Sequence, residues 1–98
     1  MPSEPPAAPK GLTVQAKGAG LHISWNRNPA AENVTSYEIR YSAEREGPYV
    51  TIYSTDATSI DYYSPVYKGW YQVVANNRKG ASRPSASVYY SGEDGENP

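Results

Sequence analysis

The residues in this chain best suited to binding chemistry are aromatic. Tyr71 and Val73 alternate on one face of an expected strand, so Trp70 is expected on the opposite, outward face. Positions 62–63 and 89–90 are consecutive tyrosines, and each pair must send one ring outward on a strand. An exposed aromatic ring offers a flat apolar surface on which the C–H face of a sugar can stack. The candidate ligand-binding residues are therefore Trp70, Tyr63, Tyr90 and Arg40.

A packing role explains the same tryptophan without any ligand. Trp70 would then lie on the aliphatic stem of Arg40 or on a side chain of a neighbouring strand. A one-residue change of register after Gly69 would instead turn Trp70 into the core. Large aromatic side chains are mostly packed against protein, so packing is the favoured interpretation.

The sequence contains no residue set suited to catalysis or metal binding. The one histidine, His22, takes an outward position with no serine or cysteine nucleophile motif around it. Asp56 and Asp61 flank a turn and a short strand, where Asp usually bonds its own backbone. The 98 residues include no cysteine, which excludes disulfides and thiolate chemistry. We therefore expect no enzyme activity, no catalytic residue, no metal and no cofactor.

A loop near the C-terminus carries a second group of candidate contact residues. Asn77, Arg78 and Lys79 lie between two expected strands, and Arg83 follows them closely. Such loop residues are available for contacts with another protein. A patch of this size is too small for nucleic-acid binding, and the formal net charge of −1 supplies no wider positive field. No nucleic-acid partner is expected.

Alternating apolar residues predict the strands that position these side chains. Every second residue is apolar within 21–26, 37–41 and 71–75, which is the period of a strand with one buried face. Turn-forming Gly, Pro and Asn residues separate these runs from shorter ones. The pattern predicts an all-β fold, a seven-stranded antiparallel β-sandwich of immunoglobulin-like type. The expected strands are 12–16, 21–26, 34–42, 49–54, 59–62, 70–76 and 85–90.

The two ends of the chain differ in composition from its middle. Residues 1–10 contain four prolines, which is typical of an extended, semi-rigid linker. Residues 91–98 are acidic and lack the apolar side chains that a core needs, so a flexible linker is expected there. Residues 11–90 form the single predicted domain. No apolar run approaches the ~20 residues of a membrane span, so no membrane association is expected.

Four motifs in a fixed order resemble a fibronectin type III module. They are Pro9-x-x-Leu12, Leu21-x-Ile23-x-Trp25, Val34-x-x-Tyr37-x-Ile39-x-Tyr41, and Tyr71-x-Val73-x-Ala75-x-Asn77-x-x-Gly80 with Pro84-Ser85 after it. The resemblance covers roughly residues 9–90 and implies the same two-sheet sandwich. One departure concerns the tyrosine that this family usually places four residues before the position of Val73, because Gly69 stands there. The resemblance implies that Tyr67 or Tyr63 supplies this corner from a shifted register.

The resemblance also implies a non-catalytic role. We expect a spacer or docking module of a larger multidomain protein whose partners are the adjacent domains. Bacterial modules of this family accompany polysaccharide-degrading catalytic domains, which implies a secreted enzyme as the parent protein. One alternative is a carbohydrate-binding module that uses the exposed aromatic residues around Trp70, with a polysaccharide as partner. The other is a protein-binding adhesion or receptor module that acts through its loops.

The same resemblance leads to three narrower expectations. The module is expected to be extracellular and monomeric. Asn33-Val34-Thr35 is a glycosylation sequon, which we expect to be unused because the composition resembles bacterial extracellular modules. In animal modules the loop equivalent to 77–80 can carry an Arg-Gly-Asp integrin signal. Here that loop reads Arg-Lys-Gly without aspartate, so integrin binding is not expected.

Overall fold

The computed structural model describes residues 4–18, 20–62 and 68–91, and these contain eight strands and one 3₁₀ turn. The strands are β1 (Thr13–Lys17), β2 (Gly20–Ser24), β3 (Ser36–Ser42), β4 (Val50–Thr55), β5 (Ser59–Tyr62), β6 (Gly69–Asn77), β7 (Gly80–Ala81) and β8 (Val88–Tyr90). The 3₁₀ turn η1 (Ala30–Glu32) lies between β2 and β3. Within the described residues there is no α-helix, and no helix that could cross a membrane.

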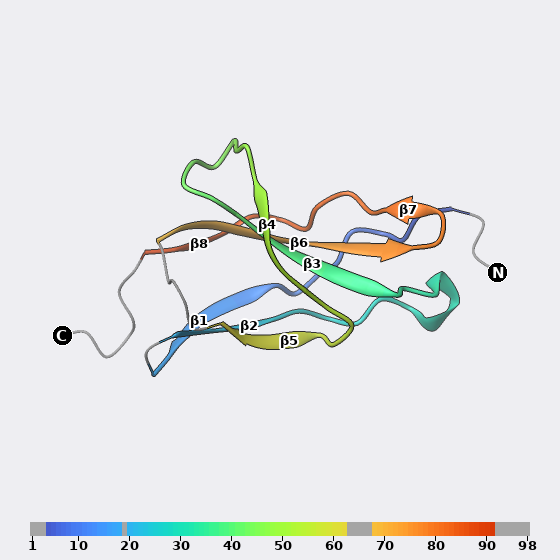
Figure 1. Cartoon of the computed structure of the whole chain (residues 1–98), viewed down its shortest axis with the longest axis horizontal. Helices are drawn as coiled ribbons and strands as arrows, with labels where there is room; N and C mark the ends of the chain where they lie inside the picture. Colours follow the sequence, from blue (N-terminus) through green and yellow to red (C-terminus); the bar gives the residue numbers. More distant parts are fainter. Residues whose placement is uncertain (1–3, 19, 63–67, 92–98) are drawn as a thin grey trace.

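The strands form two antiparallel sheets that pack face to face (Figure 1). One sheet has the order β1-β2-β5, and the other has the order β4-β3-β6-β7 with β8 also paired to β6. The predicted all-β antiparallel sandwich is therefore confirmed. The structure has eight strands where seven were expected, because the stretch 77–82, expected to be a hairpin loop, contains the short strand β7. The last predicted strand, 85–90, is shorter than expected, since β8 covers only Val88–Tyr90.

The core between the sheets is built from the positions that the alternation predicts. Between the sheets, the largest fully buried side chains are Tyr37, Tyr71, Leu21, Ile23, Ile39 and Val73. Trp25 packs edge-on against Tyr37, with ring centroids 5.4 Å apart. Val74 was expected to face solvent, and it is fully buried although it lies opposite Glu38 on the outer face. Burial of each such side chain contributes about 1.5–3 kcal/mol.

The last strand is interrupted at Pro84, which has no N–H to donate to β6. Two buried serines keep the chain attached across this interruption. The N–H of Ser82 donates to the carbonyl of Ala75 at 2.7 Å, and the N–H of Ser85 donates to the carbonyl of Val73 at 2.9 Å. In return, the serine hydroxyls accept the N–H groups of Ala75 and Val73 at 2.9 and 3.0 Å. Each serine thus exchanges two hydrogen bonds with one residue of β6, donating from its backbone N–H and accepting with its side-chain hydroxyl.

The chain enters β6 through a tightly packed corner at Gly69. This residue has φ +149°, and a Cβ here would lie 2.6 Å from Cε1 of Tyr41 and 2.7 Å from the carbonyl oxygen of Ser42. The Tyr41 hydroxyl donates a hydrogen bond of 2.6 Å to the carbonyl of Lys68. Tyr41 of β3 therefore holds Lys68 and Gly69, where the chain enters β6. The two tyrosines expected to supply it, at positions 63 and 67, lie outside the described residues.

Candidate functional site

The exposed aromatic surface lies on the outer face of β6 and β8. Trp70 of β6 is directly opposite Tyr89 of β8, and their ring centroids are 5.1 Å apart. Tyr89 is 51% exposed and Trp70 is half-buried. Trp70 therefore points outward, as the alternation predicts, and packs against an aromatic residue of the neighbouring strand.

The loop between β3 and β4 covers part of Trp70. The guanidinium carbon of Arg45 lies 5.4 Å from the centroid of the indole ring, which is cation–π geometry. The Tyr49 hydroxyl donates to the carbonyl of Arg45 at 2.8 Å and bonds the hydroxyl of Ser87 at 3.0 Å. These contacts fix the loop to the segment that precedes β8. The sequence suggested Arg40 as the residue that stacks on Trp70, and the structure places Arg45 there instead.

Arg40 belongs to a separate polar cluster on the outer face of β3. Its guanidinium donates to Oε1 of Glu38 at 3.1 Å, and the Thr51 hydroxyl donates to the same oxygen at 3.1 Å. The side-chain amide of Asn76 donates to Oε2 at 3.1 Å. Partial burial alone would raise the pKa of Glu38, but these three hydrogen bonds outweigh it and hold that pKa below its usual range. Arg40 is thus engaged with a carboxylate next to it.

Tyr90 is not part of the exposed aromatic surface. Its side chain is 9% exposed and belongs to the core cluster between the two sheets. Consecutive strand residues face opposite sides, and the register of β8 sends Tyr89 outward. The expected contribution of Tyr90 to an exposed platform is therefore corrected in favour of Tyr89. Tyr63 lies outside the described residues.

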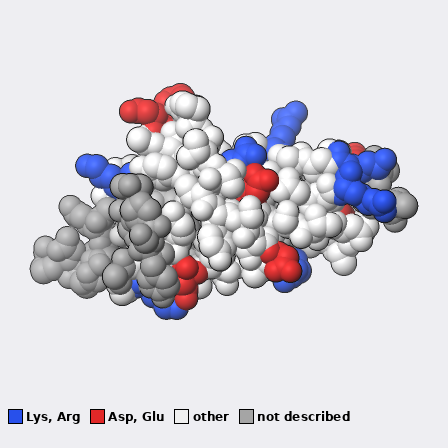
Figure 2. Space-filling model, in the orientation of Figure 1, with Lys and Arg blue, Asp and Glu red and all other residues white. Residues whose placement is uncertain are grey.

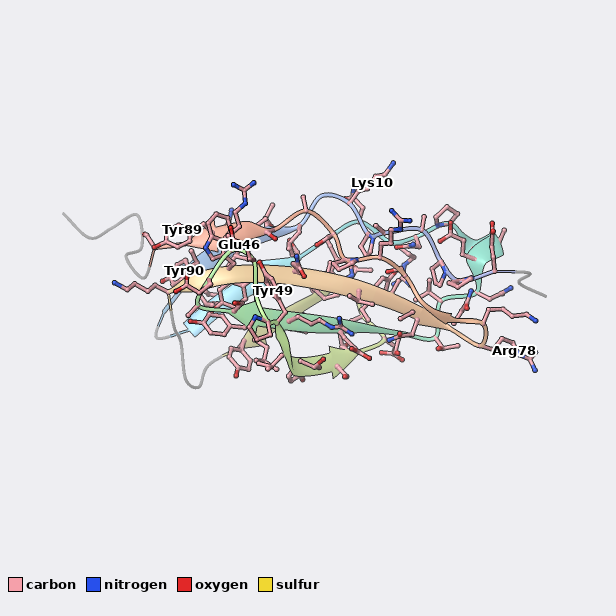
Figure 3. The ribbon with its side chains drawn as sticks, turned by 90° about the horizontal axis from the view of Figure 1, so that it is seen from above. Lys10, Glu46, Tyr49, Arg78, Tyr89 and Tyr90 are labelled. Carbon is pink, nitrogen blue, oxygen red and sulfur yellow. The ribbon has the colours of Figure 1, made fainter. Side chains whose placement is uncertain are left out.

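The predicted loop residues take two different roles at the opposite end of the molecule. Asn77 is buried, and its side-chain amide donates to the carbonyls of Glu4 at 3.0 Å and Glu32 at 2.8 Å. Arg78 and Lys79 are exposed at the turn between β6 and β7. Figure 2 shows Lys and Arg side chains gathered at this end, and Figure 3 shows Arg78 far from Tyr89. The two groups of candidate residues therefore do not form one site.

The N-terminal segment from Glu4 to Ala7 is held against the sandwich by Asn28 and Glu32, as well as by Asn77. The side-chain amide of Asn28 donates to the carbonyl of Ala7 and to Oε1 of Glu32, each at 2.8 Å. The N–H of Ala7 donates to that same carboxylate at 3.2 Å. Together with Asn77, these side chains form what we call the N-terminal clamp. From Glu4 onward, the stretch expected to be a linker is packed on the domain.

A shallow groove of about 760 Å³ lies beside the N-terminal clamp. Its lining residues are Glu4, Pro5, Pro6, Ala7, Ala8, Ala31, Glu32, Ala81, Ser82 and Arg83. In the sequence, Asn28-Pro29 indicates only that a strand ends, because proline cannot donate to a strand ladder. The amide contacts of Asn28 join segments distant in sequence, which periodicity cannot reveal.

The single histidine lies in a surface ion-pair cluster on the other sheet. Nδ1 of His22 is 2.7 Å from Oδ1 of Asp61, and Nζ of Lys17 donates to Oδ2 of Asp61 at 3.0 Å. The hydrogen bonds from His22 and then Lys17 hold the pKa of Asp61 below its usual range. Among the described residues, no group of three His, Asp or Glu side chains is placed to hold a metal ion.

Comparisons with known proteins find similar solved structures, whereas no family model and no curated protein matches the sequence. An Fn3-like protein from Clostridium thermocellum superposes with a TM-score of 0.74 and 28% identity, covering 86% of this chain and 90% of that chain. A fibronectin type III domain from human fibronectin type III domain containing protein 3 has a TM-score of 0.74 and 22% identity, covering 100% of this chain and 95% of that chain. At that identity, the human domain shows the fold alone.

This chain also resembles part of a structure of titin kinase and its flanking domains. It matches with a TM-score of 0.68 and 21% identity over 96% of this chain but only 18% of that chain. Fibronectin type III domains often sit beside neighbouring domains in this way. The ordered motifs, the two-sheet topology and the likeness to the bacterial Fn3-like protein over most of both chains agree, and the chain is a fibronectin type III domain.

Proposed function

We propose that this domain is a spacer and docking module of a larger extracellular protein, and that it sets the direction in which the neighbouring domain is attached. Fibronectin type III domains are generally non-catalytic modules within larger proteins. The observation that carries the proposal is the N-terminal clamp. A flexible tether would leave the attached domain free to turn, whereas a clamped segment fixes where the chain enters the sandwich.

The positions of the two ends support a serial arrangement. Glu4 lies at the end of the sandwich that carries β7, and β8 finishes at the opposite end (Figure 1). Domains attached at these two points would be separated by the length of the sandwich. The clamp residues Asn28 and Asn77 would then limit rotation on the N-terminal side.

Small-angle scattering on the domain with a folded reporter protein fused at each end tests this role. The expected distance distribution has a distinct maximum for the separation of the two reporters. Asn28→Ala combined with Asn77→Ala is expected to broaden that maximum, whereas the surface variant Gln15→Ala leaves it unchanged. Equal breadth in the wild type and the clamp variant would contradict the proposed spacer role.

The proposed parent protein is a secreted polysaccharide-degrading enzyme of bacterial origin. Two observations support it: the proline-rich, cysteine-free sequence and the 28% identity to a domain from Clostridium thermocellum. The domains encoded next to this one provide the test. A glycoside-cleaving catalytic domain is expected, and an intracellular signalling domain would contradict the proposal.

Carbohydrate binding is a second candidate function, and the Trp70–Tyr89 pair favours it. The two rings, whose planes are inclined at 50° to each other, lie on one outer face, and Tyr89 presents half of its surface to solvent. Affinity gel electrophoresis against soluble polysaccharides tests this function. Retardation that is lost in Tyr89→Ala and kept in Tyr53→Ala is expected, because Tyr53 is similarly exposed on a different strand. If the folded wild type is not retarded by any polysaccharide, this second function is rejected.

A further inference from the structure

Against the monomer expected from the family resemblance, we infer that β4 is a self-association edge, at which the β4 strand of a second copy of this chain pairs in the antiparallel direction. β4 is the outermost strand on one side of the five-stranded sheet. The outer side of such a strand has no neighbour in the sheet to take up its backbone hydrogen-bonding groups. This edge is separate from the clamp and from the Trp70–Tyr89 pair.

The four sheet edges differ in how well they are protected against such pairing. β1 ends in Lys17, and β5 is four residues long with Asp61 within it. The remaining edge is broken at Pro84 into strands of two and three residues. β4 has six residues, Val-Thr-Ile-Tyr-Ser-Thr, with no charge and no proline. Charge, proline and short length are three of the usual protections of an edge strand, and β4 has none of these three. It does have a bulge, a fourth protection, between Thr51 and Tyr53, so the regular part of the edge is Tyr53 to Thr55.

A bulge in β4 places two large apolar side chains along the same edge. Tyr41 of β3 pairs with Val50, and Ile39 pairs with Tyr53, with the register shift between them. Val50 and Tyr53 therefore share the side that faces the core, although they are 57% and 44% exposed. They are two of the three large hydrophobic residues exposed in the described part of the chain. The ring of Tyr53 is held edge-on against Tyr62.

The loop that precedes β4 leaves this edge uncovered. Tyr49 anchors the loop to Ser87, and Arg45 lies over Trp70, so the loop folds across the outer face of β6 and β8. Val50 begins β4 immediately after these contacts and remains exposed. The loop therefore does not protect the strand that follows it.

A second copy is the occupant that this edge fits. Two antiparallel β4 strands related by a twofold axis would present the same residues to each other. Because β4 carries no charge, no like charges would face each other across the pair. Val50 and Tyr53 of each copy would be covered by apolar residues of the other. A single strand pair buries little area, so the dimer forms at high protein concentration and dissociates on dilution.

Sedimentation velocity over a concentration series, with matched lysine variants, provides the first test. The wild type is expected to pass from monomer to dimer as concentration rises. Ser54→Lys is expected to abolish the dimer, because it puts a charge on the exposed side of β4 while facing Glu38 within the sheet. Gln15→Lys, the same change on the exposed side of β1, is expected to leave it intact. A wild type that stays monomeric throughout would overturn the inference and leave this edge to a strand of another protein.

Cysteine crosslinking gives a second test that does not depend on loss of binding. The chain contains no cysteine, so a single introduced thiol can be linked only to the thiol of another copy. With a flexible crosslinker that joins two thiols, Ser54→Cys is expected to give much more covalent dimer than Gln15→Cys. Equal crosslinking of the two variants, with both folded by circular dichroism, would show that the copies meet at random and would reject the β4 interface.

Discussion

Tyr41 lies so close to Gly69 that a Cβ at position 69 would be 2.6 Å from Cε1 and 2.8 Å from the hydroxyl oxygen of the tyrosine. The two residues come from neighbouring strands, and the tyrosine hydroxyl bonds the carbonyl of Lys68 immediately before the glycine. The absence of a side chain at position 69 lets this ring approach the backbone. The entry to β6 is thus held by a tyrosine of the adjacent strand.

Gly69→Ala is expected to destabilise the domain strongly. The new methyl group would clash with Tyr41 and with the carbonyl of Ser42, and alanine is strained at φ +149°. Strain and overpacking together predict a loss of about 2–5 kcal/mol in the free energy of unfolding. Urea unfolding measures this loss, with Gly18→Ala as the control. Gly18 has φ +57° and nothing within 4 Å of the added Cβ, so only the backbone cost of about 1–2 kcal/mol applies. Equal losses in the two variants would contradict the packing argument.

Ser85→Ala is expected to weaken the attachment of the last strand. The buried N–H of Val73 would lose its acceptor, which costs about 1–3 kcal/mol. Hydrogen exchange at the Val73 amide should become faster in the same variant. Ser24→Ala removes a hydroxyl whose bond to Thr13 is exposed, so its effect is expected within about 0.5 kcal/mol. Unchanged exchange at Val73 in Ser85→Ala would show that this hydroxyl is dispensable.

Asn77→Ala is expected to release the N-terminal segment. The substitution removes the donors to the carbonyls of Glu4 and Glu32, and we expect a loss of about 1–3 kcal/mol. Limited proteolysis should then cut near Glu4 at an earlier time. Lys79→Ala, an exposed change two residues away, serves as the control. If both variants are cut at the wild-type rate, Asn77 does not hold the segment.

The acid stability of the domain is expected to depend on Glu38. The folded domain holds the pKa of this residue below its usual range, so the ionised carboxylate stabilises the fold above a pH of about 4.3. That contribution is lost as the pH falls through the lowered pKa. Glu38→Gln is therefore expected to be less stable than the wild type at pH 7, by no more than about 1 kcal/mol because the cluster is partly solvated. The difference should shrink in acid.

Thermal unfolding of both proteins over a pH series checks this dependence on Glu38. Asp61→Asn is the comparison variant, because the pKa of Asp61 is lowered by His22 and Lys17 in an exposed cluster. The stability that Asp61→Asn loses relative to the wild type should also shrink in acid. This loss should be smaller than that of Glu38→Gln, since solvent and salt screen exposed pairs. A stability difference for Glu38→Gln that stays constant with pH would contradict the assignment.

The sequence was sufficient to predict the fold because periodicity is a local property. Apolar residues at every second position marked β2, β3 and β6, and these strands supply most of the buried core. The short β8 gave too little pattern to show which of its two tyrosines faces outward, and the structure selects Tyr89. Pro84 preceded the last predicted strand, and only the structure reveals that serine hydroxyls on both sides of it bond β6.

The candidate sites were harder to predict because they depend on how loops fold. Arg45 reaches Trp70 because the loop after β3 turns over the sheet, and nothing in the local sequence encodes that direction. Asn77 looked like an exposed loop residue, yet its amide bonds Glu4 across nearly the whole chain. Contacts between residues so distant in sequence leave no periodic signal.

The clamp also has a mechanical consequence if the two ends of the domain are pulled apart. Load would reach the amide hydrogen bonds of Asn28 and Asn77 before it reached the strand ladders of the sandwich. Their rupture would free the segment from Glu4 to Ala7, and each freed residue extends by up to about 3.5 Å. The chain would thus lengthen under tension while β1 to β8 remained folded, and it would recoil when the amides bound again.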